Sequence, residues 1–269
     1  MSALYEQFFL LGDSITQDSF SQERGFAFAA ALQAAYIRRL DVVNRGFSGY
    51  NTRQALQILP AIVPPPSHAK IRFMTVFFGA NDASLPDAPN KQHIPLDEFK
   101  ANLRAIVSHP CILAHAPRII LVAPPPMNEH LWWPRDQSSG YATVSRLAET
   151  TKIYADTVVQ LGAELHLPVL NLWKAFMSRT DFNVNAWKLG DHVPGSLALP
   201  PSDALADLMY DGLHMNPAGY QILYDELINV ISHNWPDQLP GKLPMVLPPW
   251  NDEVAWEAWK NDHVAVQKK

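Results

Sequence analysis

Two short motifs near opposite ends of the sequence hold the residue types of a nucleophilic catalytic site. An apolar run near the amino terminus leads into Gly12-Asp13-Ser14, and much later Asp211 stands three positions before His214. A serine hydroxyl is a weak nucleophile until a base removes its proton, and a carboxylate that orients this base makes it more effective. The two motifs supply those three parts, which indicates a hydrolase. Taken alone, Gly12-Asp13-Ser14 could also be a turn with a helix cap.

Two loops between these motifs could supply hydrogen-bond donors for an oxyanion. Gly49 follows an apolar segment and, without a side chain, can bring its backbone N–H close to a bound atom. Asn81 follows another apolar segment and offers a neutral amide donor. With the N–H of Ser14 they would form a three-donor oxyanion hole, in which the loss of one donor typically costs about a hundredfold or more in rate. A tight turn at Gly49 and a cap at Asn81 are the structural alternatives.

The elements around these loops predict a parallel sheet. Apolar segments predict buried strands at residues 7–12, 40–44, 71–78, 118–123 and 168–172. Helical periodicity predicts helices at residues 26–38, 51–62, 96–109, 141–161 and 217–231. Strands and helices that alternate in this way are typical of βαβ units and of a parallel sheet covered on both faces. Such sheets bind ligands at the carboxyl ends of their strands, where Ser14, Gly49 and Asn81 are expected.

The composition excludes several classes of protein. A 48% hydrophobic and 17% charged chain of 269 residues is typical of a folded globular protein. A net charge of -5 argues against a nucleic-acid partner, because phosphate binding needs a basic face. The single cysteine, Cys111, allows no internal disulfide. The absence of a basic signal-peptide start and of a long apolar stretch predicts a soluble cytoplasmic protein without a membrane span.

The motifs together resemble the signature blocks of a known family. Gly12-Asp13-Ser14, Gly49, Gly79-Ala80-Asn81-Asp82 and Asp211-Gly212-Leu213-His214 resemble the four blocks of the SGNH/GDSL hydrolases, in the family's order. The longer strings around Gly49, Asn81 and His214 are similar to the isoamyl acetate-hydrolysing esterase branch. The resemblance implies a flavodoxin-like three-layer α/β/α sandwich with a central, mostly parallel five-stranded sheet.

The resemblance also implies an activity and residue roles. It implies Ser14 as nucleophile, His214 as base and Asp211 as the residue that orients it, with Ser14, Gly49 and Asn81 as oxyanion donors. The expected reaction is hydrolysis of a small, short-chain carboxylic ester through an acyl-enzyme, with no metal or organic cofactor. A thioesterase, a carbohydrate deacetylase and a catalytically idle binding module are the alternatives.

Other polar and aromatic residues receive structural interpretations. Ser48 lacks the Gly-x-Ser-x-Gly spacing of a nucleophile elbow. His109, Cys111 and His115 have no accompanying metal motif, so we expect structural roles for them. The pair Trp132-Trp133 follows a predicted strand and is expected either in a packed loop or as a wall of the substrate pocket.

Two segments interrupt the alternation of strands and helices. Residues 183–208 enter the Asp211 loop directly, so we expect them to border the site and narrow the acyl pocket. We divide the chain into a hydrolase domain, 1–238, and a Pro/Trp-rich extension, 239–269. Trp256 and Trp259 would share one face of a helix. The extension is expected to pack on the domain, near the site or at the interface of a possible homodimer.

Overall fold

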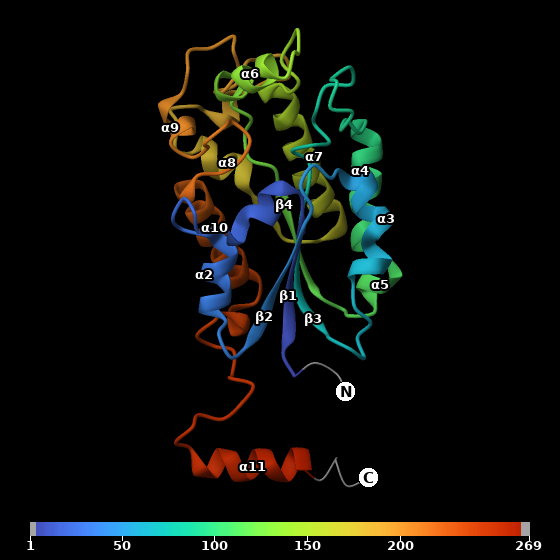
Figure 1. Ribbon diagram of the computed structural model, residues 1–269, viewed down its shortest axis with the longest axis vertical. Coiled ribbons are helices and arrows are strands. Elements are labelled where there is room, and N and C mark those ends of the chain that lie inside the picture. Colours follow the sequence, from blue (N-terminus) through green and yellow to red (C-terminus); the bar gives the residue numbers. More distant parts are fainter. Residues whose placement is uncertain (1–3, 265–269) are drawn as a thin grey trace.

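A computed structural model describes residues 4–264 and places five parallel strands in one sheet (Figure 1). The strands are β1 (Glu6–Gly12), β2 (Leu40–Gly46), β3 (Ile71–Phe77), β4 (Arg118–Ala123) and β5 (Val169–Asn171). They lie in the order β2-β1-β3-β4-β5. Because β2 and β3 flank β1, the direction of winding reverses at β1. This topology confirms the predicted α/β fold with a parallel five-stranded sheet.

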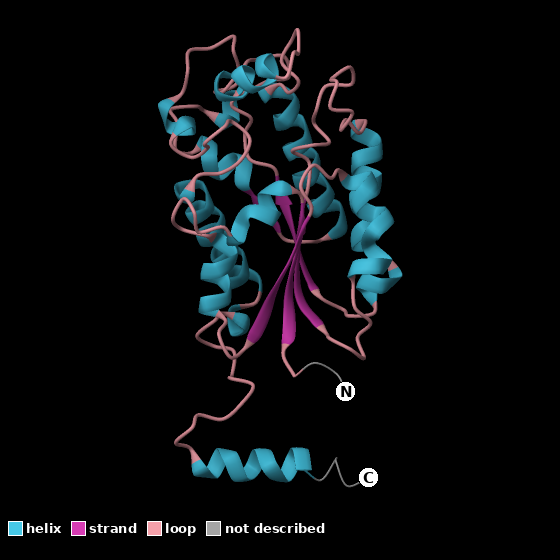
Figure 2. Cartoon of the chain, viewed as in Figure 1, coloured by secondary structure: helices cyan, strands magenta, loops and turns pink. Residues whose placement is uncertain are grey.

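Helices cover both faces of the sheet (Figure 2). One layer contains α2 (Phe28–Ala35), α8 (Leu172–Met177) and α10 (Pro217–Asn234), which contact one another through α10. The other layer contains α3 (Thr52–Ile62), α4 (Leu96–Val107) and α7 (Ala148–Leu165), which contact one another through α4. Four further helices lie between these elements: α1 (Ser14–Gln17), α5 (Pro110–Leu113), α6 (Glu129–Ser138) and α9 (Asp203–Ala206). The three-layer arrangement is therefore the predicted one.

The central strands carry continuous apolar runs because both of their faces are covered. In β1, Phe8 to Leu11 are completely buried. The ring of Phe8 stacks on Phe73 of β3, with the centroids 4.9 Å apart. A strand with one solvated face would alternate apolar and polar residues, whereas a doubly covered one does not. This burial holds the carboxyl ends of β1 and β3 side by side.

The predicted helices exist, but some boundaries differ. The helix predicted at 141–161 begins only at Ala148, because residues before it form a loop held by Asp136. The Asp136 carboxylate accepts hydrogen bonds from the Ser145 backbone N–H at 2.6 Å and from its hydroxyl at 2.9 Å. The helix predicted at 96–109 ends at Val107, and the separate short helix α5 follows. Helices α6 and α8 were not predicted, and α6 buries the polar Glu129 and Asp136 instead of an apolar stripe.

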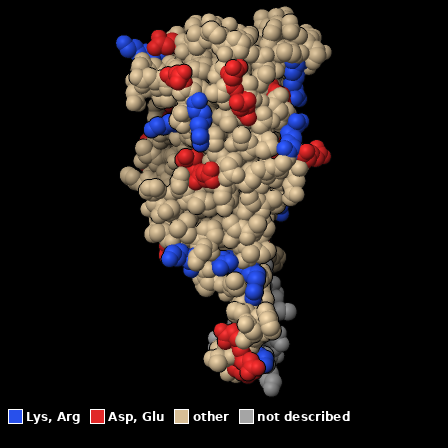
Figure 3. All heavy atoms as spheres, turned by 90° about the vertical axis from the view of Figure 1, so that its left-hand side faces the viewer, with Lys and Arg blue, Asp and Glu red and all other residues tan. Residues whose placement is uncertain are grey.

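The extension after residue 238 ends in a helix that stands apart from the domain. Figure 1 shows α11 (Glu253–Val264) beyond the amino-terminal ends of the strands, and in Figure 3 the same end of the molecule protrudes as a narrow extension. The chain leading to it is held by Arg38, whose guanidinium donates to the carbonyls of Leu247 (3.1 Å) and Pro248 (2.9 Å). The described part of the extension therefore lies at the end of the sheet opposite Ser14. Within one chain it is far from the site, so the expectation that it packs near the site was wrong. Its last residues, 265–269, lie outside the described part.

The helices of residues 4–264 include none that is both long enough and apolar enough to cross a membrane.

Candidate active site

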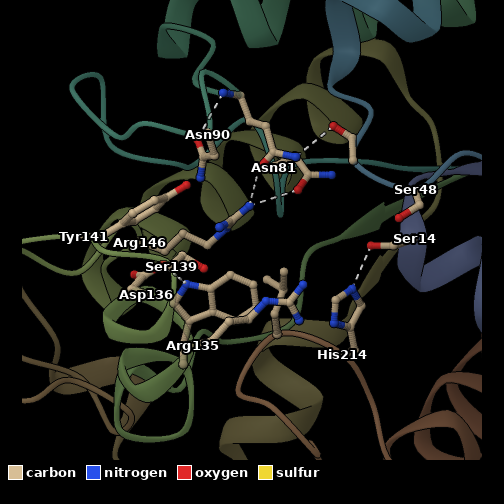
Figure 4. Close-up of a pocket in the computed structure, with 14 residues that line it drawn as sticks. Ser14, Ser48, Asn81, Asn90, Arg135, Asp136, Ser139, Tyr141, Arg146 and His214 are labelled. Carbon is tan, nitrogen blue, oxygen red and sulfur yellow. Dashed lines mark hydrogen bonds between the residues drawn. The ribbon is translucent and has the colours of Figure 1, made fainter.

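Ser14, His214 and Asp211 form a continuous chain of hydrogen-bonding groups above the sheet (Figure 4 shows Ser14 and His214). The Nε2 atom of His214 lies 2.9 Å from the Ser14 hydroxyl oxygen. Its Nδ1 atom lies 2.7 Å from Oδ2 of Asp211. Ser14 is the first residue of α1, directly after β1, so its hydroxyl is presented at the point where the sheet reverses direction. The structure thus brings together three residues that the sequence places far apart.

The loop from Asp211 to His214 is folded so that the carboxylate and the imidazole meet. Oδ1 of Asp211 accepts hydrogen bonds from the backbone N–H groups of Leu213 (3.0 Å) and His214 (2.8 Å). Gly212 has a φ of +89°, and a Cβ there would lie 2.2 Å from the Asn128 carbonyl oxygen, so only glycine fits. Burial alone would raise the pKa of Asp211, but hydrogen bonds and charge from His214 outweigh it and hold this pKa below its usual value. Asp211 is therefore an anion at neutral pH.

The three predicted oxyanion donors line the same pocket as His214. Asn81 follows β3, and its Nδ2 donates one hydrogen bond to the Tyr50 carbonyl at 2.9 Å. Gly49 follows β2 with a φ of +79°, and its carbonyl accepts a hydrogen bond from the Gln92 amide at 2.9 Å. The N–H of Ser14 belongs to the first turn of α1, where backbone donors lack intrahelical partners. Their function as oxyanion donors stays a prediction.

The pocket has a volume of about 240 Å³ and a mainly polar lining. Besides the residues above, it is lined by Ser48, Asn90, Gln92, Trp132, Arg135, Asp136, Ser139, Tyr141, Arg146 and Leu213. Figure 4 shows Asn90, Tyr141 and Arg146 on the side of the pocket away from Ser14. Trp132 forms part of its wall, the second of the two roles considered for it. An ester that enters this pocket meets more hydrogen-bonding groups than apolar surface.

Arg146 and Gln92 belong to the site, although the sequence analysis did not select them. Arg146 is only 3% exposed. Its Nη2 donates to Oδ1 of Asn81 at 3.0 Å and to Oε1 of Gln92 at 2.5 Å. Arg146 lies within residues that were predicted to form a helix, where an arginine ordinarily faces solvent. The only feature of the sequence that could have indicated a loop here is the helix-breaking Ser-Ser-Gly sequence before Tyr141.

Arg135 and Tyr210 flank His214 and Asp211. Arg135 Nη1 lies 3.3 Å from Oδ2 of Asp211, and its guanidinium lies over the ring of Trp132. The Tyr210 ring stacks on the His214 imidazole, with centroids 5.7 Å apart and the planes 16° from parallel. The Arg24 guanidinium lies over the Tyr210 ring, 3.9 Å from its centroid. These contacts restrict the rotation of the imidazole.

Ser48, His109, Cys111 and His115, for which structural roles were expected, make the following contacts. The hydroxyl of Ser48 lies in the pocket, but His214 points at Ser14 (Figure 4). The buried His115 accepts a hydrogen bond from the Ile71 N–H through Nδ1, and its Nε2 lies 2.8 Å from the Pro64 carbonyl, so it joins two parts of the fold. His109 Nδ1 lies 2.9 Å from the sulfur of Cys111. Among residues 4–261, no group of three or more His, Cys, Asp or Glu could hold a metal ion.

Residues 183–208 pack against α6 and do not line the pocket. The expectation that they border the site and narrow the acyl pocket was therefore wrong. Within the described part of the chain, the pocket is lined by none of them. They contact α6 instead: Glu129 Oε2 accepts the Leu197 N–H at 3.0 Å, and the Glu129 N–H donates to the Gly195 carbonyl at 2.8 Å. His130 Nε2 lies 3.0 Å from the Ser196 carbonyl. Because α6 carries Trp132, the segment affects the pocket by bracing this helix.

Asp13, next to Ser14, is expected to make the stability of the fold depend on pH. Its side chain is buried, Oδ1 accepts the Ile15 N–H, and Oδ2 has no hydrogen-bond partner. Burial raises the pKa of Asp13 to about 7, so the native state keeps a proton that the unfolded chain releases near pH 4. The stability that this protonation contributes is fully present below about pH 4 and is lost progressively as the pH rises to about 7.

We therefore expect Asp13→Asn, which stays neutral, to escape this loss. Between pH 5 and pH 8 the wild type should lose on the order of 2 kcal/mol of stability that the variant keeps. The difference in melting temperature between variant and wild type should then grow by roughly 4 °C over this interval. Calorimetry at both pH values measures this difference, with Asp87→Asn, at an exposed position, as the control. A pH-independent difference would show that Asp13 is ionised throughout.

Comparison with known proteins identifies the family. Residues 10–222 match the GDSL-like lipase/acylhydrolase family. The chain is 34% identical over 253 residues to the human isoamyl acetate-hydrolyzing esterase 1 homolog, covering 93% of this chain and 88% of the human protein. It is also 34% identical over 254 residues to the isoamyl acetate-hydrolyzing esterase of Saccharomyces cerevisiae, covering 92% and 95% of the two chains.

Solved structures agree at the level of the fold. A lipase/acylhydrolase from Enterococcus faecalis superposes with a TM-score of 0.56 at 23% identity, covering 89% of this chain and 98% of that one. The acetylxylan esterase Axe2 from Geobacillus stearothermophilus superposes with a TM-score of 0.56 at 22% identity, covering 86% and 95%. The sequence matches, together with this fold, confirm the predicted family and enzyme class. The chain belongs to the GDSL-like lipase/acylhydrolase family and is a carboxylic ester hydrolase.

Proposed function

We propose that this enzyme hydrolyses small, short-chain carboxylic esters through a Ser-His-Asp triad and an acyl-enzyme. The observation that carries the proposal is the continuous contact from Ser14 through His214 to the Asp211 carboxylate. His214 Nε2 takes the Ser14 proton while the hydroxyl oxygen bonds to the ester carbonyl carbon. The carbonyl oxygen becomes an oxyanion, which the N–H groups of Ser14, Gly49 and Asn81 stabilise.

The second half of the reaction reverses these proton transfers. The protonated His214 donates its proton to the alcohol oxygen as the carbon–oxygen bond breaks, which leaves an acyl group on Ser14. A water molecule then gives its proton to His214 and attacks the acyl carbon. Asp211 keeps the Nδ1–H of the imidazole directed at itself throughout, so Nε2 stays free to accept and return the proton.

The composition of the pocket supports a substrate that is short and carries polar groups. Its volume of about 240 Å³ leaves little space for a long acyl chain, and apolar side chains contribute only a small part of its lining. Asn90, Tyr141 and Gln92 can donate or accept hydrogen bonds from hydroxyl groups. This lining supports a second candidate, the removal of acetyl groups from a hydroxylated alcohol such as a sugar. An acetylxylan esterase shares the fold.

A substrate panel separates these candidates. We expect p-nitrophenyl acetate and butyrate to be hydrolysed at least tenfold more efficiently than the octanoate, measured as kcat/KM. Acetylated monosaccharides and acetyl-CoA measure deacetylase and thioesterase activity under the same conditions. Hydrolysis of long-chain esters at equal efficiency would contradict the short-chain assignment. A kcat/KM for acetyl-CoA above that for every oxygen ester would favour the thioesterase.

A further inference from the structure

A single buried guanidinium connects the two loops that carry the oxyanion donors. Arg146 lies at the end of the loop before α7, and its Nη2 donates to Oδ1 of Asn81 at 3.0 Å. Its Nε donates to the carbonyl of Ala80, the residue before Asn81, at 3.3 Å. The same side chain therefore contacts both the backbone and the amide of the loop after β3.

The contact with the second loop runs through Gln92. Nη2 of Arg146 donates to Oε1 of Gln92 at 2.5 Å, and the Nε2 of Gln92 donates to the Gly49 carbonyl at 2.9 Å. Because Gln92 receives a hydrogen bond on its oxygen, its amide must present nitrogen to Gly49. Arg146 thus holds the Gly49 carbonyl indirectly, through Gln92, and so constrains the backbone one bond beyond the Cα that follows the donor N–H. Figure 4 shows these hydrogen bonds on the pocket wall opposite Arg135.

The Arg146 side chain is itself fixed in position, so it can fix the groups that it contacts. Its guanidinium lies 4.8 Å from the centroid of the Trp132 ring. Burial lowers the pKa of Arg146 to about 10, while the charges of Asp136 and Asp13 oppose the shift, so it stays a cation at neutral pH. Asp136 is itself fixed by the Ser145 N–H and the Trp132 indole. A buried charge with several directed contacts has little freedom to move.

The amide of Asn81 shows what this fixation achieves. Its Oδ1 accepts from Arg146, and one N–H donates to the Tyr50 carbonyl. An amide held at both of these points cannot rotate about its terminal bond, so its second N–H keeps a single direction. Donors that need no reorganisation during the reaction are the ones that stabilise an oxyanion most.

We infer that Arg146 is the positioning residue of the oxyanion hole, holding the Asn81 amide directly and the Gly49 carbonyl through Gln92. This inference rests on the proposed function, because it presupposes that Asn81 and Gly49 bind the oxyanion. Arg146 acts through its neighbours: its guanidinium fixes the Asn81 donor and restrains the backbone of the loop that carries the Gly49 donor. The fork geometry is required, since two donors at fixed angles reach Asn81 and Ala80 together.

The test compares Arg146→Lys with Asn81→Ala and with the double variant. Lysine keeps the positive charge but lacks the planar fork, so the variant isolates positioning from charge. Asn81→Ala should lower kcat about 100-fold with KM changed less than threefold. Arg146→Lys should lower kcat roughly 10- to 100-fold with the same small change in KM. In the Asn81→Ala background, Arg146→Lys should cost at most about fivefold more, because the donor it orients is absent.

Two further measurements separate positioning from a general structural effect. The affinity for a trifluoromethyl ketone, whose adduct with Ser14 carries an oxyanion, should fall by the same factor as kcat/KM in each variant. Arg104→Lys, on the exposed surface of α4, is the matched control for an arginine-to-lysine change and should leave kcat unaltered. Gln92→Leu leaves the buried guanidinium of Arg146 in place and should lower kcat roughly fivefold even if Arg146→Lys folds poorly.

Three results would overturn the inference. Losses that multiply fully in the double variant would show that Arg146 and Asn81 act independently. A change confined to KM would make Arg146 a substrate-binding residue. Normal kcat in a folded Asn81→Ala enzyme would remove Asn81 from the oxyanion hole, and the inference with it. Covalent labelling of Ser14 in the wild-type enzyme by an organophosphate does not depend on the role given to Arg146, and its absence would instead count against the proposed mechanism.

Discussion

Ser14→Ala is expected to lower kcat for p-nitrophenyl acetate by on the order of 10⁵–10⁶-fold while the protein remains folded. The hydroxyl supplies the bond-forming oxygen, and no neighbouring group is aligned to replace it: His214 Nε2 lies 2.9 Å from Ser14 Oγ and is directed at it. Alanine removes one buried oxygen without changing the turn after β1. Circular dichroism and the melting temperature should therefore stay close to those of the wild type.

Two controls identify Ser14 as the nucleophile rather than as a structural residue. Ser48→Ala alters the other pocket serine near Ser14, and it should retain activity within about tenfold, because His214 does not point at Ser48. An organophosphate should modify the wild type and Ser48→Ala at Ser14, as peptide mass spectrometry would show. Near-normal turnover by folded Ser14→Ala would rule out the proposed mechanism.

The motifs at strand ends were predictable because they are local in sequence. Gly12-Asp13-Ser14 and Asp211-Gly212-Leu213-His214 each encode a complete short structure: a strand followed by a tight turn, and a loop whose carboxylate caps its own backbone. The alternation of apolar strands and helices then predicts the parallel sheet, and a parallel sheet brings strand ends together. These two steps place Ser14 at the carboxyl edge of the sheet, whereas His214 lies in the loop before α10, and its meeting with Ser14 was expected from the chemistry of the two motifs and from the family resemblance.

The parts that sequence reasoning missed depend on long-range contacts. Arg146 reaches Asn81 from a loop that helical periodicity assigned to a helix, and Asp136, on a helix that was not predicted, keeps this loop unwound. Residues 183–208 precede Asp211 directly in sequence, yet they pack behind α6 because Glu129 binds their backbone. The closeness of residues 183–208 to Asp211 in sequence therefore did not indicate that they pack against α6 and away from the pocket.

His214→Ala should cause a loss close to that of Ser14→Ala, and the double variant should lose little more. The imidazole accepts the serine proton and later returns it to the leaving alcohol, so without it the hydroxyl of Ser14 is an unactivated nucleophile. Members of a triad act as a unit, and removal of a second member costs little once the first is gone. Single-turnover kinetics of the two single variants and the double variant with p-nitrophenyl acetate measure this dependence.

Asp211→Asn provides the graded member of this series. The amide cannot balance a protonated imidazole and can hold it in the wrong tautomer, so kcat should fall on the order of 10⁴-fold while the loop keeps its backbone contacts. Arg135, which lies 3.3 Å from the same carboxylate, should matter far less because its guanidinium is more than half exposed.

Losses for Ser14→Ala and His214→Ala that multiply in the double variant would mean that His214 does not act on the Ser14 hydroxyl. The hydrogen-bonded contact between them would then be structural, and another base would have to serve the reaction.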